Sequence, residues 1–446
     1  MADIFPFRGI RYNIEIVGDL AHVATPPYDV ISDEEQDMYY ERHPNNIIRL
    51  DKGKETATDD DQDNPYTRAA EYFKNWISEG ILLKDKAPCL YLTSVEFTIN
   101  GQTFTRFGLI ARARLEPFEK GVILPHEETY SKIKSERLEL MKACHANFSH
   151  IFSIFTDKDD IMGRLKSAVS GSKPETEFTD DAGHHHQMWC IADPKIHEAV
   201  TESLKKRRLF IADGHHRYET ALTYRDWLAE NSPDFSPEHP ANFIMMYLCS
   251  IEDPGLIILP THRLLTSVSA AQRNTFVSKA NQHFDVQTFA FGDNNPDQEK
   301  SQARSKLLTT MRAETDKHII GGYIKGYPEF YAFTLKPDVM RQKFNSEIEE
   351  PLRELDVTVL TRIILTELLE FDHKDLDDET LISYTSDAVE AIEAVDGGEY
   401  DMAFILNPPS NEQVRDIADA GYTMPRKTTF YYPKAITGQV MNSLDD

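Results

Sequence analysis

From residue 151 onward, apolar β-rich runs alternate with helical patterns, and this alternation restricts the fold more than any other feature of the sequence. The predicted strands are HIFSIFT, HQMWCIA, RRLFIA and NFIMMYLCSI, and the predicted helices are DIMGRLKSAVS, PKIHEAVTESLKK and HHRYETALTYRDWLAE. Strands separated by helices pack as a sheet covered by helices. The sequence therefore predicts an α/β (α+β) fold with mixed sheets.

The length of the chain, 446 residues, exceeds what one ordinary hydrophobic core holds, so several domains are expected. We predict an N-terminal α+β domain over residues 1–150 and an α/β domain over 151–265. A C-terminal α+β domain is predicted over 266–446.

Local signals within the first 150 residues predict several elements. Two β-rich runs flank Asn100-Gly101, the preferred two-residue turn of a hairpin. Ser32 and Glu35 form a capping-box pattern that starts a helix. The run IIRL is predicted to be a short strand, the acidic stretch 51–64 a mobile loop, and residues 132–145 a long helix.

Charge and cysteine content exclude some classes of protein. The formal net charge of −26 opposes nucleic-acid and anionic membrane partners. The four cysteines (Cys89, Cys144, Cys190 and Cys249) show no C-x-x-C pair, which argues against a disulfide framework or a thiolate zinc site. No signal peptide and no long apolar run are visible, so we expect a cytoplasmic protein.

The segment IADGHHRYETA, residues 211–221, is the sharpest chemical feature. An apolar strand runs into Asp213-Gly214, and a helix is predicted to start at His215. The N–H groups of a helix start suit an anion such as phosphate, and His215, His216 and Arg217 add donors or cations there. Asp213 could accept a proton or bind a metal. The simpler interpretation is that Asp213 caps the helix and the histidines lie on the surface.

The segment PHEETY, residues 125–130, is the second candidate. His126, Glu127 and Glu128 are predicted to lie in a turn before a helix, where a carboxylate could act as general base or Mg²⁺ ligand. A zinc-protease helix is excluded because Tyr130 stands where the second histidine would be. Helix capping by these residues is an equal alternative.

Other histidines and basic residues carry weaker signals. His262 and Arg263 end an apolar strand and are candidate anion contacts, or simply a strand end. Lys427 and Lys434 could close a pocket over an anion, although such residues are more often surface lysines. The triplet 184–186 is interpreted as a polar stretch before a strand, because consecutive histidines without spaced partners lack chelating geometry.

Seven motifs in order resemble a bacterial and archaeal family known as domain of unknown function 1015. They are FPFRGIRY, ATPPYDVIS, HPNNIIRL, PHEETY, IADGHHRYETAL, LPTHRLL and MPRKTTFYYPK, and they extend from residue 5 to about 440. Locally, Asp213 to Arg217 are similar to the signature of the ParB/sulfiredoxin-like superfamily. That superfamily includes free-serine kinases, CTP-hydrolysing partition switches and peroxiredoxin-repair enzymes.

The local resemblance implies a phosphotransferase that uses ATP or ADP with Mg²⁺ on a small hydroxyl metabolite, with free L-serine as a candidate. It implies that Gly214, His215 and Arg217 bind phosphate, and that Asp213, His216, Glu127 and Glu128 are catalytic. His262 and Arg263, at the end of their apolar strand, are predicted as further phosphate contacts. Asp213 and Glu128 would bind Mg²⁺. A nucleotide-binding switch and a metal-dependent hydrolase are the alternatives. We expect the His216→Ala and Arg217→Ala changes to abolish nucleotide affinity and leave the melting temperature nearly unchanged.

Overall fold

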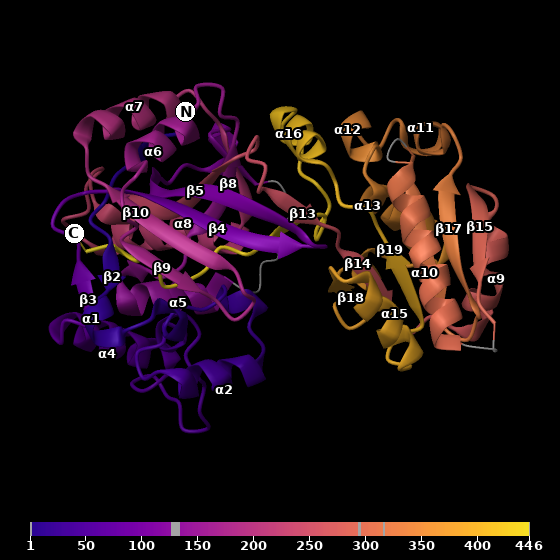
Figure 1. Ribbon diagram of the computed structural model, residues 1–446, viewed down its shortest axis with the longest axis horizontal. Coiled ribbons are helices and arrows are strands. Elements are labelled where there is room, and N and C mark those ends of the chain that lie inside the picture. The colour runs from indigo at the N-terminus through magenta and orange to yellow at the C-terminus, as the bar shows by residue number, and fades with distance from the viewer. Residues whose placement is uncertain (1, 126–133, 293–295, 315–316, 446) are drawn as a thin grey trace. The chain divides into compact units, whose positions relative to one another are not determined.

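The computed structural model describes residues 2–125, 134–292, 296–314 and 317–445, and the chain divides into two compact units (Figure 1). Unit 1 consists of Met1–Ile257 and Tyr431–Asp446, and unit 2 consists of Ile258–Phe430. The predicted boundary at residue 150 has no counterpart here, because strands from both sides of it join one sheet. The mixed α/β fold class is confirmed.

Unit 1 is built on a mixed sheet, which has nine strands among the described residues. Its order is β6 (Ile123–Pro125), β11 (Leu209–Asp213), β8 (Ile151–Phe155), β12 (Phe243–Ser250), β5 (Gln102–Arg114), β4 (Leu90–Ile99), β10 (His185–Ile191) and β9 (Thr176–Thr179), and β1 (Ile4–Phe5) pairs with β5. The pairs β6–β11 and β8–β12 are parallel, and the others are antiparallel. The strands predicted from residue 151 onward are thus all present.

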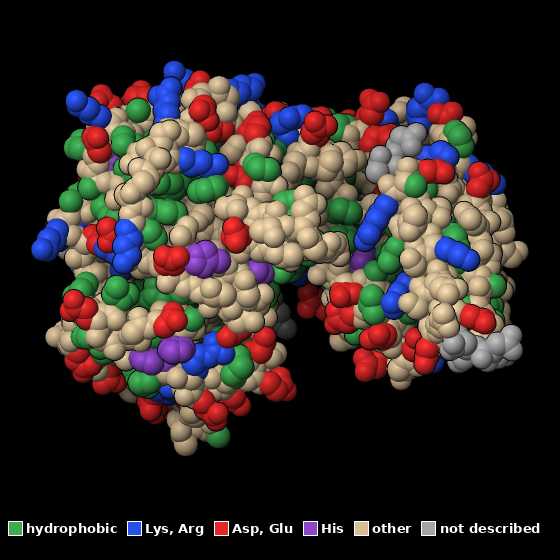
Figure 2. Space-filling view, in the orientation of Figure 1, with side chains coloured by type: hydrophobic (Ala, Val, Ile, Leu, Met, Phe, Trp, Pro, Cys, Tyr) green, Lys and Arg blue, Asp and Glu red, His purple; other side chains and the backbone are tan. Residues whose placement is uncertain are grey.

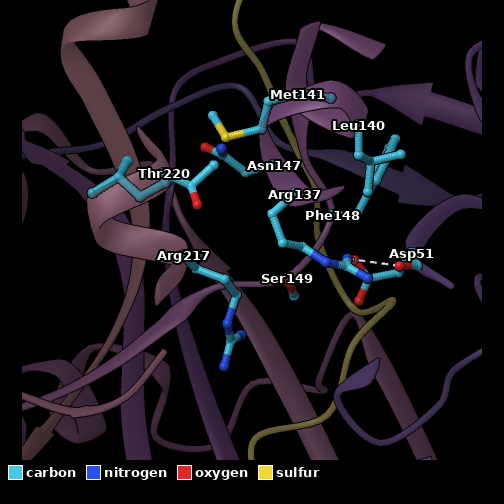
Figure 3. Close-up of a pocket in the computed structure, with 11 residues that line it drawn as sticks. Asp51, Arg137, Leu140, Met141, Asn147, Phe148, Ser149, Arg217 and Thr220 are labelled. Carbon is cyan, nitrogen blue, oxygen red and sulfur yellow. Dashed lines mark hydrogen bonds and ion pairs between the residues drawn. The ribbon is translucent and has the colours of Figure 1, made fainter. Parts of the chain in front are cut away.

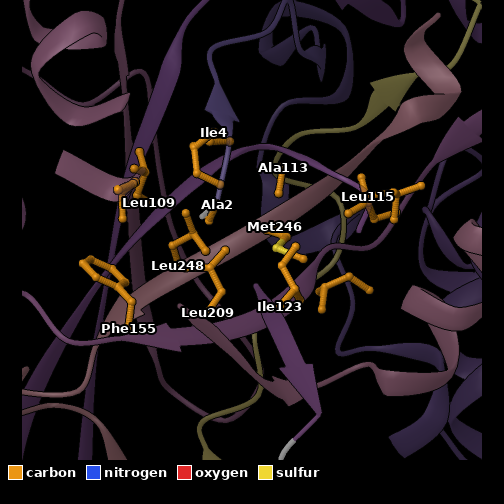
Figure 4. Close-up of a cluster of buried hydrophobic side chains, with 14 of the residues drawn as sticks. Ala2, Ile4, Leu109, Ala113, Leu115, Ile123, Phe155, Leu209, Met246 and Leu248 are labelled. Carbon is orange, nitrogen blue, oxygen red and sulfur yellow. The ribbon is translucent and has the colours of Figure 1, made fainter. Parts of the chain in front are cut away.

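The core of unit 1 joins this sheet to three helices that follow the predicted strands. The apolar cluster includes Ile4, Leu109, Met246 and Leu248 from the strands (Figure 4). It also takes side chains from α6 (Ile161–Val169), α7 (Pro194–Leu204) and α8 (His215–Asn231). This packing fixes where β11 ends and α8 begins.

A second apolar cluster of unit 1 joins the N-terminal helices to the end of the chain. It contains residues of α4 (Pro65–Ser78) and α5 (Lys134–Cys144) together with Ile436 and Met441. The capping-box helix is confirmed as α2 (Asp33–Arg42), and the hairpin turns at Asn100-Gly101, where both residues have positive φ.

The strand predicted for IIRL is wrong, because residues Ile48–Asp51 form the short helix α3. The Asn46 side chain accepts a hydrogen bond from the Ile48 N–H at 2.9 Å, and Ile47, Ile48 and Leu50 are buried. A short apolar run of this kind does not distinguish a buried helical turn from a strand by its periodicity.

The argument against a disulfide framework did not anticipate a single disulfide. Cys89 and Cys190 are joined in unit 1, with Cα atoms 5.7 Å apart, while Cys144 and Cys249 are free and buried. Cys190 lies in β10, which pairs with β4, and Cys89 directly precedes β4. Sheet pairing brings together two cysteines that are 101 residues apart in sequence.

Unit 2 contains an antiparallel sheet with helices, as the α+β prediction for this part of the chain requires. The sheet has six strands among the described residues, in the order β15 (Phe284–Ala290), β17 (Glu329–Leu335), β16 (Ile319–Ile324), β19 (Met402–Ile405), β14 (His262–Leu265) and β18 (Ile382–Thr385). The helices α10 (Pro296–Ala313) and α15 (Ala388–Asp396) contribute to its own apolar core.

The surface reflects the acidic composition. Asp and Glu side chains are spread over the visible face of each unit, interspersed with Lys and Arg (Figure 2). Within the part of the chain that the structure describes, no helix combines the length and apolarity needed to cross a membrane.

Candidate functional site

The predicted strand–turn–helix over residues 209–231 is present as β11, Gly214 and α8. The pairing of β11 with β8 shifts register between Ile211 and Asp213, so the strand is bulged where it ends. Gly214 has φ 90° and ψ 28°, a left-handed conformation that favours glycine. A Cβ atom at this position would lie 2.9 Å from Arg217 Nε, so the turn also needs the space that glycine leaves.

Arg217 is the central cation of this turn. Its side chain is buried, and Nη1 donates to the His150 carbonyl oxygen at 2.7 Å, while Nη2 donates to Asp213 Oδ2. The second oxygen, Asp213 Oδ1, accepts from Lys434 Nζ. Of the two lysines considered from sequence, Lys434 is therefore at the site, and Lys427 belongs to unit 2.

These ion pairs decide the protonation of the turn. Burial alone would raise the pKa of Asp213, but Lys434 and Arg217 outweigh it and hold that pKa well below its usual range. Burial, reinforced by Arg217, lowers the pKa of His150 to about 3. Asp213 is thus a carboxylate shared between two cations, which differs from the proton acceptor and Mg²⁺ ligand suggested by the sequence. His215 and His216 are half-buried on the first turn of α8.

A small pocket of about 40 Å³ lies beside this turn in unit 1 (Figure 3). Arg217 and Thr220 of α8 line it together with Arg137 of α5. The other lining residues are Asp51, Leu140, Met141, Ala146, Asn147, Phe148, Ser149 and Ile244. The pocket is therefore lined by one arginine from each of two helices that pack against each other.

Asp51 supplies the carboxylate of this pocket. Arg137 Nη1 donates to Asp51 Oδ1 at 3.0 Å and to the Asp51 carbonyl oxygen at 2.7 Å. Among the described residues, Asp51 Oδ2 is buried without a hydrogen-bond partner. Burial raises the pKa of Asp51, although Arg137 and Arg217 act in the opposite direction. Such an oxygen can accept a proton or a ligand hydrogen bond.

Tyr28 completes the set of groups around the two arginines. The Arg137 guanidinium carbon lies 3.4 Å from the centroid of the Tyr28 ring, and that of Arg217 lies 5.8 Å from it. Burial raises the pKa of Tyr28, so its hydroxyl stays protonated at neutral pH. The aromatic face holds the planar guanidinium group in place.

Sequence reasoning missed Tyr28, Asp51 and Arg137. Tyr28 belongs to the motif ATPPYDVIS, and Asp51 directly follows HPNNIIRL, so both were near segments already singled out. Asp51 was assigned to a mobile loop, whereas it is the buried last residue of α3. Arg137 carried no local signal on its helix.

One pair of the predicted site residues belongs to unit 2. His262 and Arg263 are buried in unit 2, where the Leu406 N–H donates to His262 Nδ1 at 3.2 Å. Arg263 donates to the carbonyl oxygens of Thr261 and Lys427. Burial lowers the pKa of His262 to about 4. The phosphate-binding role of these two residues stays a prediction.

His126, Glu127 and Glu128 lie outside the described residues, so their catalytic and Mg²⁺-binding roles stay predictions as well.

The burial of Arg217 changes one expectation. Removing a side chain that holds both the His150 carbonyl and Asp213 perturbs the fold as well as any ligand. Arg217→Ala is therefore expected to lower the melting temperature, and His216 is the better position for a binding test.

Comparison with solved structures gives remote similarities. A conserved hypothetical protein from Pyrococcus furiosus aligns with 73% of this chain and 93% of its own, at 12% identity and TM-score 0.34. A free serine kinase variant in complex with ADP aligns with 73% and 89%, at 11% identity and TM-score 0.35. SbnI from Staphylococcus aureus, truncated at its C-terminus, aligns with 73% and 86%, at 10% identity and TM-score 0.32.

Among curated protein sequences there is no match. The family model described as "Protein of unknown function (DUF1015)" matches residues 4–358, most of the chain. The chain therefore belongs to the DUF1015 family.

Proposed function

We propose that this protein is a nucleotide-dependent phosphotransferase that acts on a small hydroxyl metabolite, with free L-serine as the first candidate. One observation carries the proposal. Two arginines, Arg137 and Arg217, and the unpartnered buried oxygen of Asp51 share a pocket beside the start of α8. Phosphoryl transfer needs charge stabilisation, positioning and a proton acceptor, and these groups supply each of them in kind.

The start of α8 supports binding of the donor phosphates. The positive end of the helix dipole favours an anion at this point. Gly214 directly precedes this helix, and His215 and His216 follow on its first turn. Arg137 and Arg217 approach from the pocket side, so negative charge on a transferred group would be stabilised from two helices.

Asp51 supports the acceptor half of the reaction. A hydroxyl group must lose its proton as it attacks phosphorus, and a buried carboxylate with a raised pKa is a suitable base. Its Oδ2 atom is the oxygen available for this, since Oδ1 is held by Arg137. Glu127 and Glu128 remain further candidates for the same role.

The nucleotide would be ATP or ADP with Mg²⁺. Mg²⁺ binds one or two carboxylates together with donor phosphates, and it would shield the phosphate charge. Asp51 Oδ2 is assigned to the base and cannot bind the ion at the same time, so Glu128 is the candidate ligand. Asp213 fits this role less well, because its two oxygens already accept from Lys434 and Arg217.

Isothermal titration of the full chain with ADP and ATP, each with Mg²⁺, tests the binding step. We expect one site, and we expect His216→Ala to weaken binding without lowering the melting temperature. Incubation with ATP or ADP and L-serine, followed by mass spectrometry for O-phosphoserine, tests the chemistry.

Three possible outcomes separate the two interpretations. Binding with product supports the kinase, and binding without product from serine or other small alcohols supports the alternative, a nucleotide-binding regulator. Absence of any binding at millimolar nucleotide contradicts both.

A further inference from the structure

Far from the Arg217 pocket in sequence, three side chains of the β9–β10 hairpin converge. Asp180 follows β9, His184 immediately precedes β10, and His186 lies within β10. Successive side chains of a strand point to opposite faces, so His184 and His186 share a face and His185 points away. The sequence interpretation that this triplet lacks chelating geometry missed Asp180, which supplies the third group.

The three groups meet at a single oxygen. Asp180 Oδ2 lies 3.0 Å from His184 Nδ1 and 2.9 Å from His186 Nε2. Asp180 Oδ1 accepts from the backbone N–H groups of Ala182, at 3.0 Å, and His184, at 2.9 Å. The backbone therefore fixes one oxygen of the carboxylate and directs the other toward both imidazoles.

The imidazole rings are held from outside as well. His184 Nε2 lies 2.9 Å from Tyr432 Oη, and the Phe178 ring stacks on His186 with centroids 5.0 Å apart. His184 is 7% exposed and His186 is 4% exposed, while the Asp180 side chain is 21% exposed. Two imidazoles and one carboxylate, with a fourth position for water, are a known ligand set of catalytic zinc sites.

We propose that Asp180, His184 and His186 bind a divalent transition-metal ion of the zinc class. Within the described residues, they form the one group of three such side chains whose ligand atoms all lie within 4.8 Å of one another. Around a tetrahedral Zn²⁺ with bonds of about 2.0–2.1 Å, neighbouring ligand atoms are roughly 3.3 Å apart. The two separations from Asp180 Oδ2 are a few tenths of an ångström shorter, and the two imidazole nitrogens lie within 4.8 Å of each other, so small side-chain shifts make room for the ion.

Two of the three ligands, His184 and Asp180, already have the outer partners that a metal site needs. Coordination through His184 Nδ1 leaves the proton on Nε2, which then donates to Tyr432 Oη. Coordination through His186 Nε2 leaves the proton on Nδ1. Asp180 binds through Oδ2 while Oδ1 keeps its two backbone hydrogen bonds. Two imidazoles and one carboxylate favour zinc over Mg²⁺ or Ca²⁺, which prefer oxygen ligands.

The competing interpretation is a structural cluster in which two neutral histidines donate to one carboxylate. His185 provides a matched control, because it neighbours both ligands in sequence. His185 Nε2 lies 3.1 Å from Glu177 Oε1, and the His185 side chain is 38% exposed. If these residues form a zinc site, changing His186 lowers the amount of bound zinc and changing His185 does not. If zinc binds only to the acidic surface in general, neither change lowers it.

The test uses the full chain expressed without a histidine tag, stripped with chelator and titrated with Zn²⁺ in excess Mg²⁺. Bound zinc is counted by equilibrium dialysis and atomic spectrometry in the wild type and in Asp180→Asn, His186→Ala and His185→Ala. We expect one Zn²⁺ per chain in the wild type and in His185→Ala. For Asp180→Asn and His186→Ala we expect affinity at least about tenfold weaker, the loss that removing even an outer partner causes.

Two further measurements keep the result interpretable. Circular dichroism verifies that each variant is folded. If His186→Ala is unfolded, Asp180→Asn still tests the site, because it preserves the shape of the side chain. Co²⁺ bound to the wild type should show the visible absorption of a four- or five-coordinate ion, lost in Asp180→Asn. Equal zinc binding by all four proteins, or none by the wild type, would overturn the proposal.

Discussion

At the scale of single residues, the turn after β11 is organised by one carboxylate shared between two cations. Asp213 accepts from Arg217 and from Lys434, which lies 221 residues further along the chain. A carboxylate in this position balances the positive charge of the turn and orients the guanidinium group. We therefore assign Asp213 to positioning and look to Asp51 for proton transfer.

The first prediction concerns Arg217. Arg217→Ala leaves Asp213 buried with one cation fewer and the His150 carbonyl without its donor. Breaking a buried ion pair costs about 3–5 kcal/mol, so we expect a loss of that order in the free energy of unfolding measured in urea. Arg341→Ala is the control, since Arg341 is 69% exposed and the change should cost less than about 0.5 kcal/mol. Equal midpoints for the two variants would contradict the structural role.

The second prediction concerns Asp51. Asp51→Asn keeps an oxygen for Arg137 but removes the base, so we expect turnover to fall about 10²–10⁴-fold with little change in nucleotide affinity. Asp61→Asn, in the exposed acidic loop, makes the same chemical change as a control.

The pH profile gives an independent check on Asp51. The base works deprotonated, and burial raises its pKa, so activity should be lost on acidification at a pH above the ordinary aspartate range. If the residual activity of Asp51→Asn falls at the same acidic pH as the wild-type activity, the base is another residue. Glu127 and Glu128 would then be tested next.

At the scale of elements, the helices and turns that depend only on neighbouring residues were predicted correctly. The Asn100-Gly101 hairpin, the Ser32–Glu35 capping box and the β11–α8 turn each depend on a few neighbouring residues, and all are present. Residues 47–50 were predicted wrongly because hydrogen bonds from outside the run decide their conformation. The Ile47 N–H donates to the carbonyl oxygen of Val23, 24 residues upstream.

The third prediction isolates the role of Gly214. An alanine here would keep positive φ, costing about 1–2 kcal/mol, and would in addition push its Cβ against Arg217. Gly171→Ala is the matched control, because Gly171 has φ +75° and no atom within 4 Å of the added Cβ. We expect both changes to lower the urea midpoint, Gly214→Ala more, and only Gly214→Ala to weaken nucleotide binding. Equal effects of the two changes on the urea midpoint would mean that the Arg217 side chain moves to accommodate the added Cβ at no cost.

The fourth prediction concerns the Cys89–Cys190 disulfide between β10 and the residue before β4. It closes a long loop in the unfolded chain, so its reduction should destabilise the protein by about 2–4 kcal/mol. The oxidised protein, denatured, should show two reactive thiols from Cys144 and Cys249, and four after reduction. Dithiothreitol should not lower the melting temperature of the Cys89→Ala, Cys190→Ala double variant. Four thiols before reduction would show that the bond is absent.

At the scale of the whole molecule, the candidate site could be predicted only in part, because its residues come from five distant segments. The turn at 213–217 was predicted from its glycine, its charged residues and its place between a strand and a helix. Tyr28, Asp51 and Arg137 reach it through tertiary packing, which leaves no pattern in a single sequence, whereas Lys434 was already a candidate anion contact from the sequence. For the same reason the two-unit division was missed, since the chain returns to unit 1 at Tyr431 after completing unit 2.

The last prediction compares two fragments of the chain, because the chain re-enters unit 1 at Tyr431 after completing unit 2. Unit 1 depends on its C-terminal segment, because Tyr431, Met441 and Leu444 are almost fully buried there and Lys434 pairs with Asp213. Fragment 1–257 should therefore lack cooperative thermal unfolding. Fragment 258–430 carries its own six-stranded sheet and apolar core and should unfold cooperatively.

Calorimetry and circular dichroism on the two fragments measure this contrast, and fusing residues 431–446 to 1–257 through a flexible linker is the control. The fusion should regain cooperative unfolding, because it restores the buried residues of unit 1 without any part of unit 2. A fusion in which Lys434 is changed to Ala should fold less stably, since Asp213 then keeps only Arg217 as a partner. Cooperative folding of 1–257 alone would mean that the C-terminal segment completes the site without being needed for the core.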